Sequence, residues 1–113
     1  MEKKYLDMIR HIKDPEGADR DWSVYVVRCS DDTLYTGITK NVVARLSRHN
    51  SGKGAAYTRP RRPVQLLYRE GRFTRSEALV REALIKTFSR TQKEQLVTAG
   101  SRRRKRLIKP DKK

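Results

Sequence analysis

Cysteine is nearly absent from this sequence, since Cys29 is the single one among 113 residues. One cysteine excludes an internal disulfide, so Cys29 has no disulfide partner, and it excludes a zinc site built from several thiolates. Cys29 ends an apolar run, and we therefore predict a small buried side chain rather than a nucleophile.

Long hydrophobic runs are also missing, and only 35% of the residues are hydrophobic. The first 21 residues are interspersed with charges, so neither a signal peptide nor a transmembrane helix is expected. We expect an intracellular, cytoplasmic protein with one modest hydrophobic core.

Acidic residues are scarce relative to basic ones. The chain has 28 Lys/Arg and 13 Asp/Glu, which gives a net charge of +15. Residues 101–113 hold eight basic residues and one acidic residue, whereas residues 1–21 hold five and six. Solubility does not require so large an excess of positive charge. The negatively charged phosphates of nucleic acid attract such a charge, so nucleic acid is the favoured partner. A membrane surface is the weaker candidate, because no segment joins a basic run to a broad apolar face.

The residue pattern predicts a small α/β (α+β) domain with a three-stranded antiparallel sheet flanked by helices. Strands are expected over residues 22–29, 33–38 and 64–70, where Val, Leu, Tyr and Trp are frequent. The first two strands should form a hairpin, since Asp31 and Asp32 lie between them.

Within the domain, three helices are expected besides the strands. One runs to about residue 50, is capped by Thr39 or Asn41, and has Val42, Val43 and Leu46 on its apolar side. The segment Thr74-Arg75-Ser76-Glu77 fits a capping box that starts a helix ending near Ser89. A weaker pattern indicates a short helix over residues 91–98.

These elements divide the chain into three parts. Residues 1–21 form an N-terminal extension with a short amphipathic helix over residues 4–13. Residues 22–98 form the domain. Residues 99–113 are a basic tail, which is predicted to be disordered because it is rich in charge and poor in apolar residues.

The segment from Tyr25 to His49 holds several groups suited to chemistry on phosphate. Arg45 and His49 lie one helical turn apart, and a guanidinium offers rigid paired donors to phosphate oxygens. Two phenols, Tyr25 and Tyr35, come from the predicted hairpin. An ordinary solvated helix edge and two packing tyrosines are the structural alternatives. A phenol is a poor base unless a cation such as Arg45 or Lys40 lowers its pKa.

Glu82 lies in the apolar stripe of the later helix, where a carboxylate is costly unless it is paired or binds a metal. A salt bridge, for example to Arg45, is the structural alternative. A Mg²⁺ ligand is the functional one, since this cation prefers carboxylate oxygen. By contrast, Glu77 has a capping role, and Glu70 and Glu94 are predicted to face solvent.

Basic residues also fill the loop over residues 51–63 and the tail. Tyr57 offers a surface on which a base can stack, whereas a plain surface loop is the alternative. The predicted nucleic-acid contacts are Lys53, Tyr57, Arg59, Arg61, Arg62, Arg102, Arg103 and Arg104.

In the order of these residues the chain resembles the GIY-YIG nuclease superfamily, and most closely its small stand-alone bacterial branch (UPF0213-like). The signatures correspond to Ser23-Val24-Tyr25 and Tyr35-Thr36-Gly37, and the family arginine falls on Arg45. A His-Asn pair follows as His49-Asn50, and the metal-binding glutamate falls on Glu82. The stretches 51–59 and 61–64 are typical of that branch. The resemblance covers about residues 22–95.

The resemblance implies hydrolysis of DNA phosphodiester bonds with Mg²⁺ or Mn²⁺ as cofactor. Glu82 would hold the metal, Arg45 would stabilise the phosphate charge, and Tyr25, Tyr35 or His49 would deprotonate the attacking water. Gly37 would turn the chain or let backbone approach the substrate. We expect no second domain that selects a site, and we therefore expect structure-selective or weakly specific cleavage in DNA repair or recombination.

The chain departs from the family pattern at three positions. Ser23 replaces the first signature glycine and Thr36 replaces the middle isoleucine, and both of these changes are mild. The more serious departure is Ile38, which stands where some relatives have a lysine. A catalytically inactive nucleic-acid-binding module of the same fold is therefore the main alternative. An adaptor whose tail docks on an acidic partner is the third.

Overall fold

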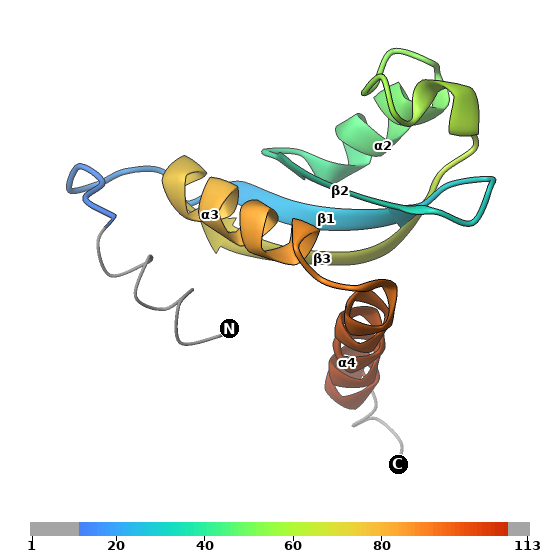
Figure 1. The fold of residues 1–113 in the computed structure, drawn as a ribbon. Helices are drawn as coiled ribbons and strands as arrows, with labels where there is room; N and C mark the ends of the chain where they lie inside the picture. The colour runs from blue at the N-terminus through green and yellow to red at the C-terminus, as the bar shows by residue number, and fades with distance from the viewer. Residues whose placement is uncertain (1–11, 109–113) are drawn as a thin grey trace.

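The computed structural model describes the backbone of residues 12–108 and the side chains of residues 12–100. Three strands form one antiparallel sheet in the order β2-β1-β3, with helices on both faces (Figure 1). The strands are β1 (Trp22–Arg28), β2 (Leu34–Thr39) and β3 (Gln65–Phe73). The predicted three-stranded antiparallel sheet is confirmed, and β1 is its central strand.

The central strand β1 is buried on both faces, and its side chains divide the core into two layers. Alternate residues of a strand point to opposite faces of a sheet. Val24 and Val26 accordingly belong to one buried cluster, and Tyr25 and Val27 belong to another. The candidate site residue Tyr25 therefore lies on one defined face of the sheet.

The helix α2 (Val42–Asn50) covers the face that carries Tyr25. Asn41 caps it, since its side chain accepts a hydrogen bond from the Ala44 N–H at 3.0 Å. Leu46 packs on the cluster below, as predicted. Val43 was predicted on the same apolar side but is 75% exposed. It follows the buried Val42 by one residue, which is a rotation of about 100° around the helix.

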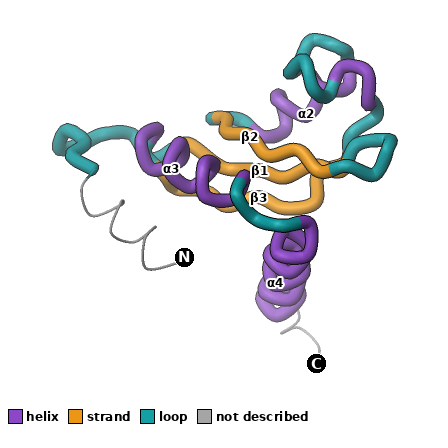
Figure 2. Tube along the Cα trace, in the orientation of Figure 1, coloured by secondary structure: helices purple, strands orange, loops and turns teal. Residues whose placement is uncertain are grey.

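The helix α3 (Arg75–Lys86) lies on the other face, where Ala78 and Ile85 join the cluster of Val24 and Val26 (Figure 2). The predicted capping box is confirmed. The Thr74 hydroxyl accepts from the Glu77 N–H at 3.2 Å, and the Glu77 carboxylate accepts from the Thr74 N–H at 3.0 Å.

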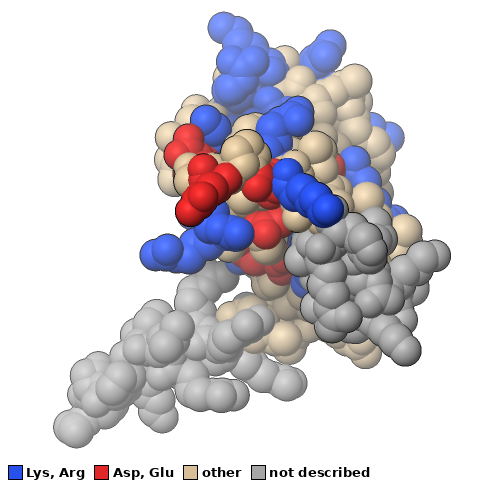
Figure 3. Space-filling model, turned by 90° about the vertical axis from the view of Figure 1, so that its left-hand side faces the viewer, with Lys and Arg blue, Asp and Glu red and all other residues tan. Residues whose placement is uncertain are grey.

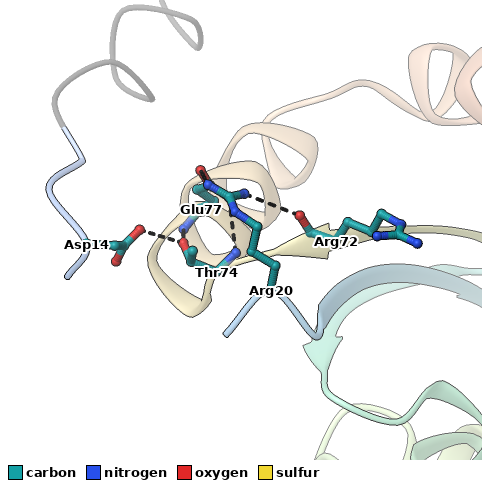
Figure 4. Close-up of polar contacts among 5 residues, drawn as sticks. All are labelled: Asp14, Arg20, Arg72, Thr74 and Glu77. Carbon is teal, nitrogen blue, oxygen red and sulfur yellow. Dashed lines mark hydrogen bonds and ion pairs between the residues drawn. The ribbon is translucent and has the colours of Figure 1, made fainter. Parts of the chain in front are cut away.

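The N-terminal segment extends this capping network (Figure 4). The Thr74 hydroxyl donates to the Asp14 carboxylate at 2.7 Å, and the Arg20 guanidinium donates to the Glu77 carboxylate at 2.8 Å. Residues 14–20 are thereby fastened to the start of α3. The helix predicted over residues 4–13 falls mostly outside the described residues.

The helix α4 (Arg90–Ile108) is longer than predicted, because it continues past residue 98 and through Gly100. A Cβ at Gly100 would lie 2.7 Å from the ring of Tyr68 on β3. The missing side chain therefore lets α4 pack closely on the sheet, which explains a glycine inside a helix. The tail predicted to begin at residue 99 therefore overlaps α4 as far as Ile108.

Within residues 12–108, no helix combines the length and the apolar character needed to span a bilayer. Even α4, with 19 residues, is rich in Lys and Arg.

Candidate active site

Tyr25 is the centre of the candidate site. Its side chain is buried, and its hydroxyl lies 2.8 Å from Nε2 of His49. The Arg45 Nε–H donates to the same hydroxyl at 3.3 Å. Two of the predicted catalytic groups on α2 therefore meet at the phenol of β1.

Gly37 makes room for this phenol. It is the partner of Tyr25 in the β1–β2 pairing, and a Cβ at Gly37 would lie 2.6 Å from the Tyr25 hydroxyl. Gly37 was predicted as a signature turn, but it lies within the strand β2. Its role is the close approach of a side chain rather than a change of chain direction.

His49 is fully buried, whereas the structural alternative placed it on a solvated helix edge. Its Nδ1 lies 2.8 Å from the Thr58 hydroxyl, because the loop after α2 folds back over the imidazole. Burial lowers the pKa of His49, and the positive charge of Arg45 lowers it further. The imidazole is therefore neutral at neutral pH.

The environment of the Tyr25 phenol keeps it protonated at neutral pH. Burial raises the pKa of Tyr25 and is the largest effect. The hydrogen bond and the charge of Arg45 lower the pKa, and the charges of Tyr35 and Glu82 raise it. Lys40, the other cation considered, lies elsewhere: its ammonium is 5.9 Å from the centre of the Trp22 ring and 3.9 Å from the Asp21 carboxylate.

Tyr35 lies beside this group and links it to the basic loop. Its ring centre is 5.5 Å from that of His49, in an edge-on arrangement. On another side it stacks with Tyr57, with ring centres 5.9 Å apart. The Arg61 guanidinium carbon is 4.0 Å from the centre of the Tyr57 ring. Tyr57, predicted to stack on a base, is therefore already engaged by Tyr35 and Arg61.

Glu82 comes from α3, on the other face of the sheet, and its side chain is 17% exposed. Its ion-pair partner is Lys86, with Nζ 3.3 Å from the carboxylate, and not Arg45 as the structural alternative predicted. The charge of Glu82 nevertheless contributes to the raised pKa of Tyr25. Of the groups that shift the Tyr25 pKa, Glu82 contributes the least.

Glu82 fits a role as a Mg²⁺ ligand. The Lys86 ammonium beside it is 54% exposed, and such surface pairs contribute little stability, so a cation can replace the ammonium. Mg²⁺ binds through one or two carboxylates and keeps several waters. Across the described part of the chain, no three His, Cys, Asp or Glu side chains gather into an all-protein metal site. Glu82 would therefore act as a single protein ligand.

Glu70 was predicted to face solvent, and the structure corrects this. Its side chain is 18% exposed and accepts from the Arg81 Nε–H at 2.5 Å. It also accepts from the Tyr68 hydroxyl. Because Arg81 belongs to α3 and Glu70 to β3, this carboxylate joins helix to sheet rather than taking part in the site. Glu94 is exposed, as predicted, and pairs with Arg90.

The basic loop is held close to the site by Asn50 at the end of α2. Its side chain accepts from the Val64 N–H at 2.7 Å and donates to the Val64 carbonyl at 3.2 Å. Within the loop, Arg61 donates to Asp31 and to the Tyr57 carbonyl, and Arg62 donates to the Arg59 carbonyl. The side chains of Lys53, Arg59 and Arg62 are exposed.

The tail arginines predicted to contact nucleic acid, Arg102, Arg103 and Arg104, lie on the backbone of α4. Their side chains are outside the described residues.

Sequence reasoning missed two residues of this region. Thr58 lies in a loop without periodicity, so no pattern signalled its contact with His49. Arg69 is exposed and is the partner of Tyr25 in the β1–β3 pairing, which places both on one face of the sheet. The strand alternation would have found it if the register had been known.

Comparisons with known proteins show the family and the fold. Residues 21–95 match the family model described as the GIY-YIG catalytic domain. The UPF0213 protein of Staphylococcus epidermidis is 54% identical over 77 residues, which cover 68% of this chain and 94% of the relative. The UPF0213 protein of Desulfotalea psychrophila is 53% identical over 92 residues, which cover 80% and 84%. The solution NMR structure of a protein from E. faecalis is 40% identical with a TM-score of 0.50, covering 73% and 88%.

Proposed function

The chain belongs to the GIY-YIG family, and on this basis we propose that it is a Mg²⁺-dependent endonuclease that hydrolyses DNA phosphodiester bonds. We propose structure-selective or weakly specific cleavage, in DNA repair or recombination. The observation that carries the proposal is the contact of Arg45 and His49 with one buried phenol, Tyr25.

Arg45 is the proposed phosphate-binding group. Its Nε–H is used by Tyr25, and a guanidinium has five N–H donors, so the two terminal nitrogens remain to bind phosphate oxygens. A fixed positive charge at this point stabilises the negative charge that develops on the scissile phosphate.

Tyr25 and His49 are the proposed base, acting as a pair. As the attacking water gives a proton to the Tyr25 oxygen, Tyr25 passes its own proton to Nε2 of His49, 2.8 Å away. A neutral imidazole can accept this proton, whereas a phenol with a raised pKa is a poor base on its own. Mg²⁺ held by Glu82 would supply charge neutralisation at the phosphate and the leaving oxygen.

Tyr25 and Tyr35 have different roles in this mechanism, since only Tyr25 is part of the base. We expect Tyr25→Phe to lose cleavage and Tyr35→Phe to retain most of it, because Tyr25 holds the hydrogen bond to His49. Single-turnover cleavage rates of the two variants test the choice. A larger loss in Tyr35→Phe would make that residue the base instead.

The proposed function is tested with labelled branched, flapped and single-stranded DNA in the presence of Mg²⁺. We expect Arg45→Ala and Glu82→Ala to lose cleavage, while Glu82→Ala still binds DNA. Matched controls are Arg48→Ala, which removes an exposed arginine from the same helix, and Glu94→Ala, which removes an exposed glutamate.

A catalytically inactive nucleic-acid-binding module is the second candidate. The Glu82–Lys86 ion pair favours it, because the carboxylate already has a cation as partner. Metal-independent DNA binding without cleavage, equal in the parent protein and in Glu82→Ala, would support this second function.

A further inference from the structure

The candidate base continues into a buried chain of hydrogen bonds that ends in the loop after α2. Tyr25 contacts Nε2 of His49, and Nδ1 of His49 contacts the Thr58 hydroxyl, each at 2.8 Å. The Thr58 hydroxyl also lies 3.1 Å from the Ala55 carbonyl. The side chains of Tyr25, His49 and Thr58 are at most 2% exposed. The direction of these hydrogen bonds decides what the imidazole can do.

The contacts of the Tyr25 hydroxyl indicate that it donates its hydrogen bond to His49. The hydroxyl already accepts a hydrogen bond from Arg45, so its proton needs an acceptor. Among the described residues, Nε2 of His49 is the acceptor within reach of that proton. If Nε2 carried a hydrogen, the phenol proton would be buried without a partner, which costs about 1–3 kcal/mol. Nε2 is therefore the unprotonated nitrogen, and Nδ1 carries the hydrogen.

The Thr58 end agrees with this direction. The Thr58 hydroxyl has one proton, and the Ala55 carbonyl is an acceptor for it. The lone pairs of the Thr58 oxygen are then free to accept the Nδ1–H of His49. Both ends of the chain of hydrogen bonds support the same tautomer.

We propose that Thr58 is a positioning residue that holds His49 in the Nδ1–H tautomer, so that Nε2 can take the proton of Tyr25. The Thr58 oxygen accepts from Nδ1 before and after that transfer, so the imidazolium that forms is still hydrogen-bonded on both nitrogens. Thr58 acts through His49 and need not touch the substrate. This role of Thr58 rests on the proposed nuclease function. Only the kinetic test below depends on DNA cleavage, because the tautomer of His49 can be measured without it.

The loop is shaped to bring Thr58 to this place. A Cβ at Gly54 would lie 2.4 Å from Nδ1 of His49, so the chain can pass over the imidazole only without a side chain there. The other groups that face the imidazole are Tyr25 on β1, Tyr35 on β2 and Arg45 on α2. None of them is an acceptor for Nδ1, and Thr58 is therefore the group that stabilises the hydrogen on that nitrogen.

The direct test is the imidazole ¹⁵N NMR spectrum of His49 near neutral pH, recorded on the full chain without DNA or metal. A His11→Gln background leaves His49 as the single histidine. We expect Nδ1 to carry the hydrogen and Nε2 to be unprotonated. An Nε2–H imidazole in this protein would overturn the inference without any change at Thr58.

Two variants at Thr58 isolate its hydroxyl. Thr58→Ser keeps the acceptor, so we expect the Nδ1–H tautomer to persist. Thr58→Val has nearly the same shape without the acceptor, so we expect a substantial population of the Nε2–H tautomer. An unchanged tautomer in a folded Thr58→Val would overturn the proposal. If Thr58→Val does not fold, Thr58→Ser decides the question. Loss of the Nδ1–H tautomer in Thr58→Ser would then overturn the proposal, and retention of that tautomer would support the proposal.

The kinetic test uses single-turnover cleavage of flapped DNA with Mg²⁺ over a pH series. We expect Thr58→Val to lower the rate by at least tenfold and to shift the pH profile, while DNA binding and the Thr58→Ser rate stay near those of the parent protein. A parent-like profile in Thr58→Val, together with a changed tautomer, would contradict the catalytic part of the inference. If the parent protein does not cleave DNA, the proposed nuclease function fails, and the NMR result still decides the tautomer.

Discussion

At the scale of the residue, the buried imidazole of His49 makes stability sensitive to acid. Burial lowers its pKa in the folded state below the value of about 6.5 expected in the unfolded chain. As pH falls below about 6.5, the unfolded state therefore binds more protons than the folded state, and folding loses stability. The stability is fully present above that pH and is lost as pH falls through the folded-state pKa.

We expect the melting temperature of the protein to drop more steeply on acidification than that of His49→Gln. Thermal unfolding followed by circular dichroism over a pH series measures the two slopes. His11→Gln provides the matched control and should follow the parent protein. Equal slopes in His49→Gln and the parent would contradict a buried neutral imidazole.

The grouping of Tyr25, Tyr35 and Arg45 could be predicted because these residues lie in a hairpin and the helix directly after it. Their proximity follows from short connections and from the periods of strand and helix. The burial of His49 could not be predicted in the same way. It depends on the loop that carries Gly54 and Thr58 folding back over the imidazole, and loop conformation leaves no periodic pattern.

At the scale of the element, Gly100 tests how α4 packs on the sheet. Replacing a glycine by alanine inside an exposed helix adds about 0.8–1.0 kcal/mol of stability. Here the added Cβ would lie 2.7 Å from the Tyr68 ring, and overpacking costs about 1–3 kcal/mol. We therefore expect Gly100→Ala to destabilise the protein or to leave it no more stable.

Denaturant unfolding of Gly100→Ala measures the sign of this change. Ala99→Gly is the control, because Ala99 is one residue earlier and exposed. It should lose only the stability that corresponds to the difference in helix propensity between alanine and glycine. A clear gain in stability in Gly100→Ala would show that α4 does not approach Tyr68 as closely as described.

The elements that could be predicted carry local signals. The Asp-rich turn indicated the hairpin, and Thr74 and Glu77 indicated the start of α3. The continuation of α4 to Ile108 had no such signal, because glycine typically ends a helix and a run of charge favours disorder. Packing on the Tyr68 cluster accounts for α4 as far as Gly100, and a contact so distant in sequence cannot be read from local composition.

At the scale of the whole molecule, charge is distributed unevenly. Acidic side chains gather at the end where residues 12–21 meet the start of α3 (Figure 3). Asp14 and Glu77 belong to this end and are joined there through Thr74. We expect DNA to avoid this acidic end and to approach the face of Tyr25, Arg45 and the basic loop.

Arg69 lies on this proposed DNA-binding face, as the strand partner of Tyr25. We expect Arg69→Glu to weaken DNA binding several-fold, because it replaces an exposed positive charge beside the site with a negative one. Arg75→Glu makes the same change at the start of α3, on the other face, and should weaken binding less. Fluorescence anisotropy with labelled DNA compares them, and equal losses would argue against a defined binding face.

The basic end of α4 leaves the domain on the face opposite Tyr25 (Figure 1). Residues 101–113 should therefore contact substrate away from the scissile phosphate. We expect their deletion to lower DNA affinity and to flatten its dependence on salt, without changing which substrates are cut. Binding titrations at several salt concentrations measure this, and an unchanged slope would remove the tail from the interface.

The proposed function requires that Glu82 and Arg45 bring a metal and a phosphate to the Tyr25–His49 pair. The most direct measurement is the single-turnover cleavage rate of flapped DNA at saturating protein, as a function of Mg²⁺ concentration, for the parent protein and for Glu82→Gln. We expect a saturable Mg²⁺ dependence in the parent and a loss of at least a hundredfold in Glu82→Gln, with DNA binding retained. Cleavage by Glu82→Gln at the parent rate, or none by the parent at any Mg²⁺ concentration, would contradict it.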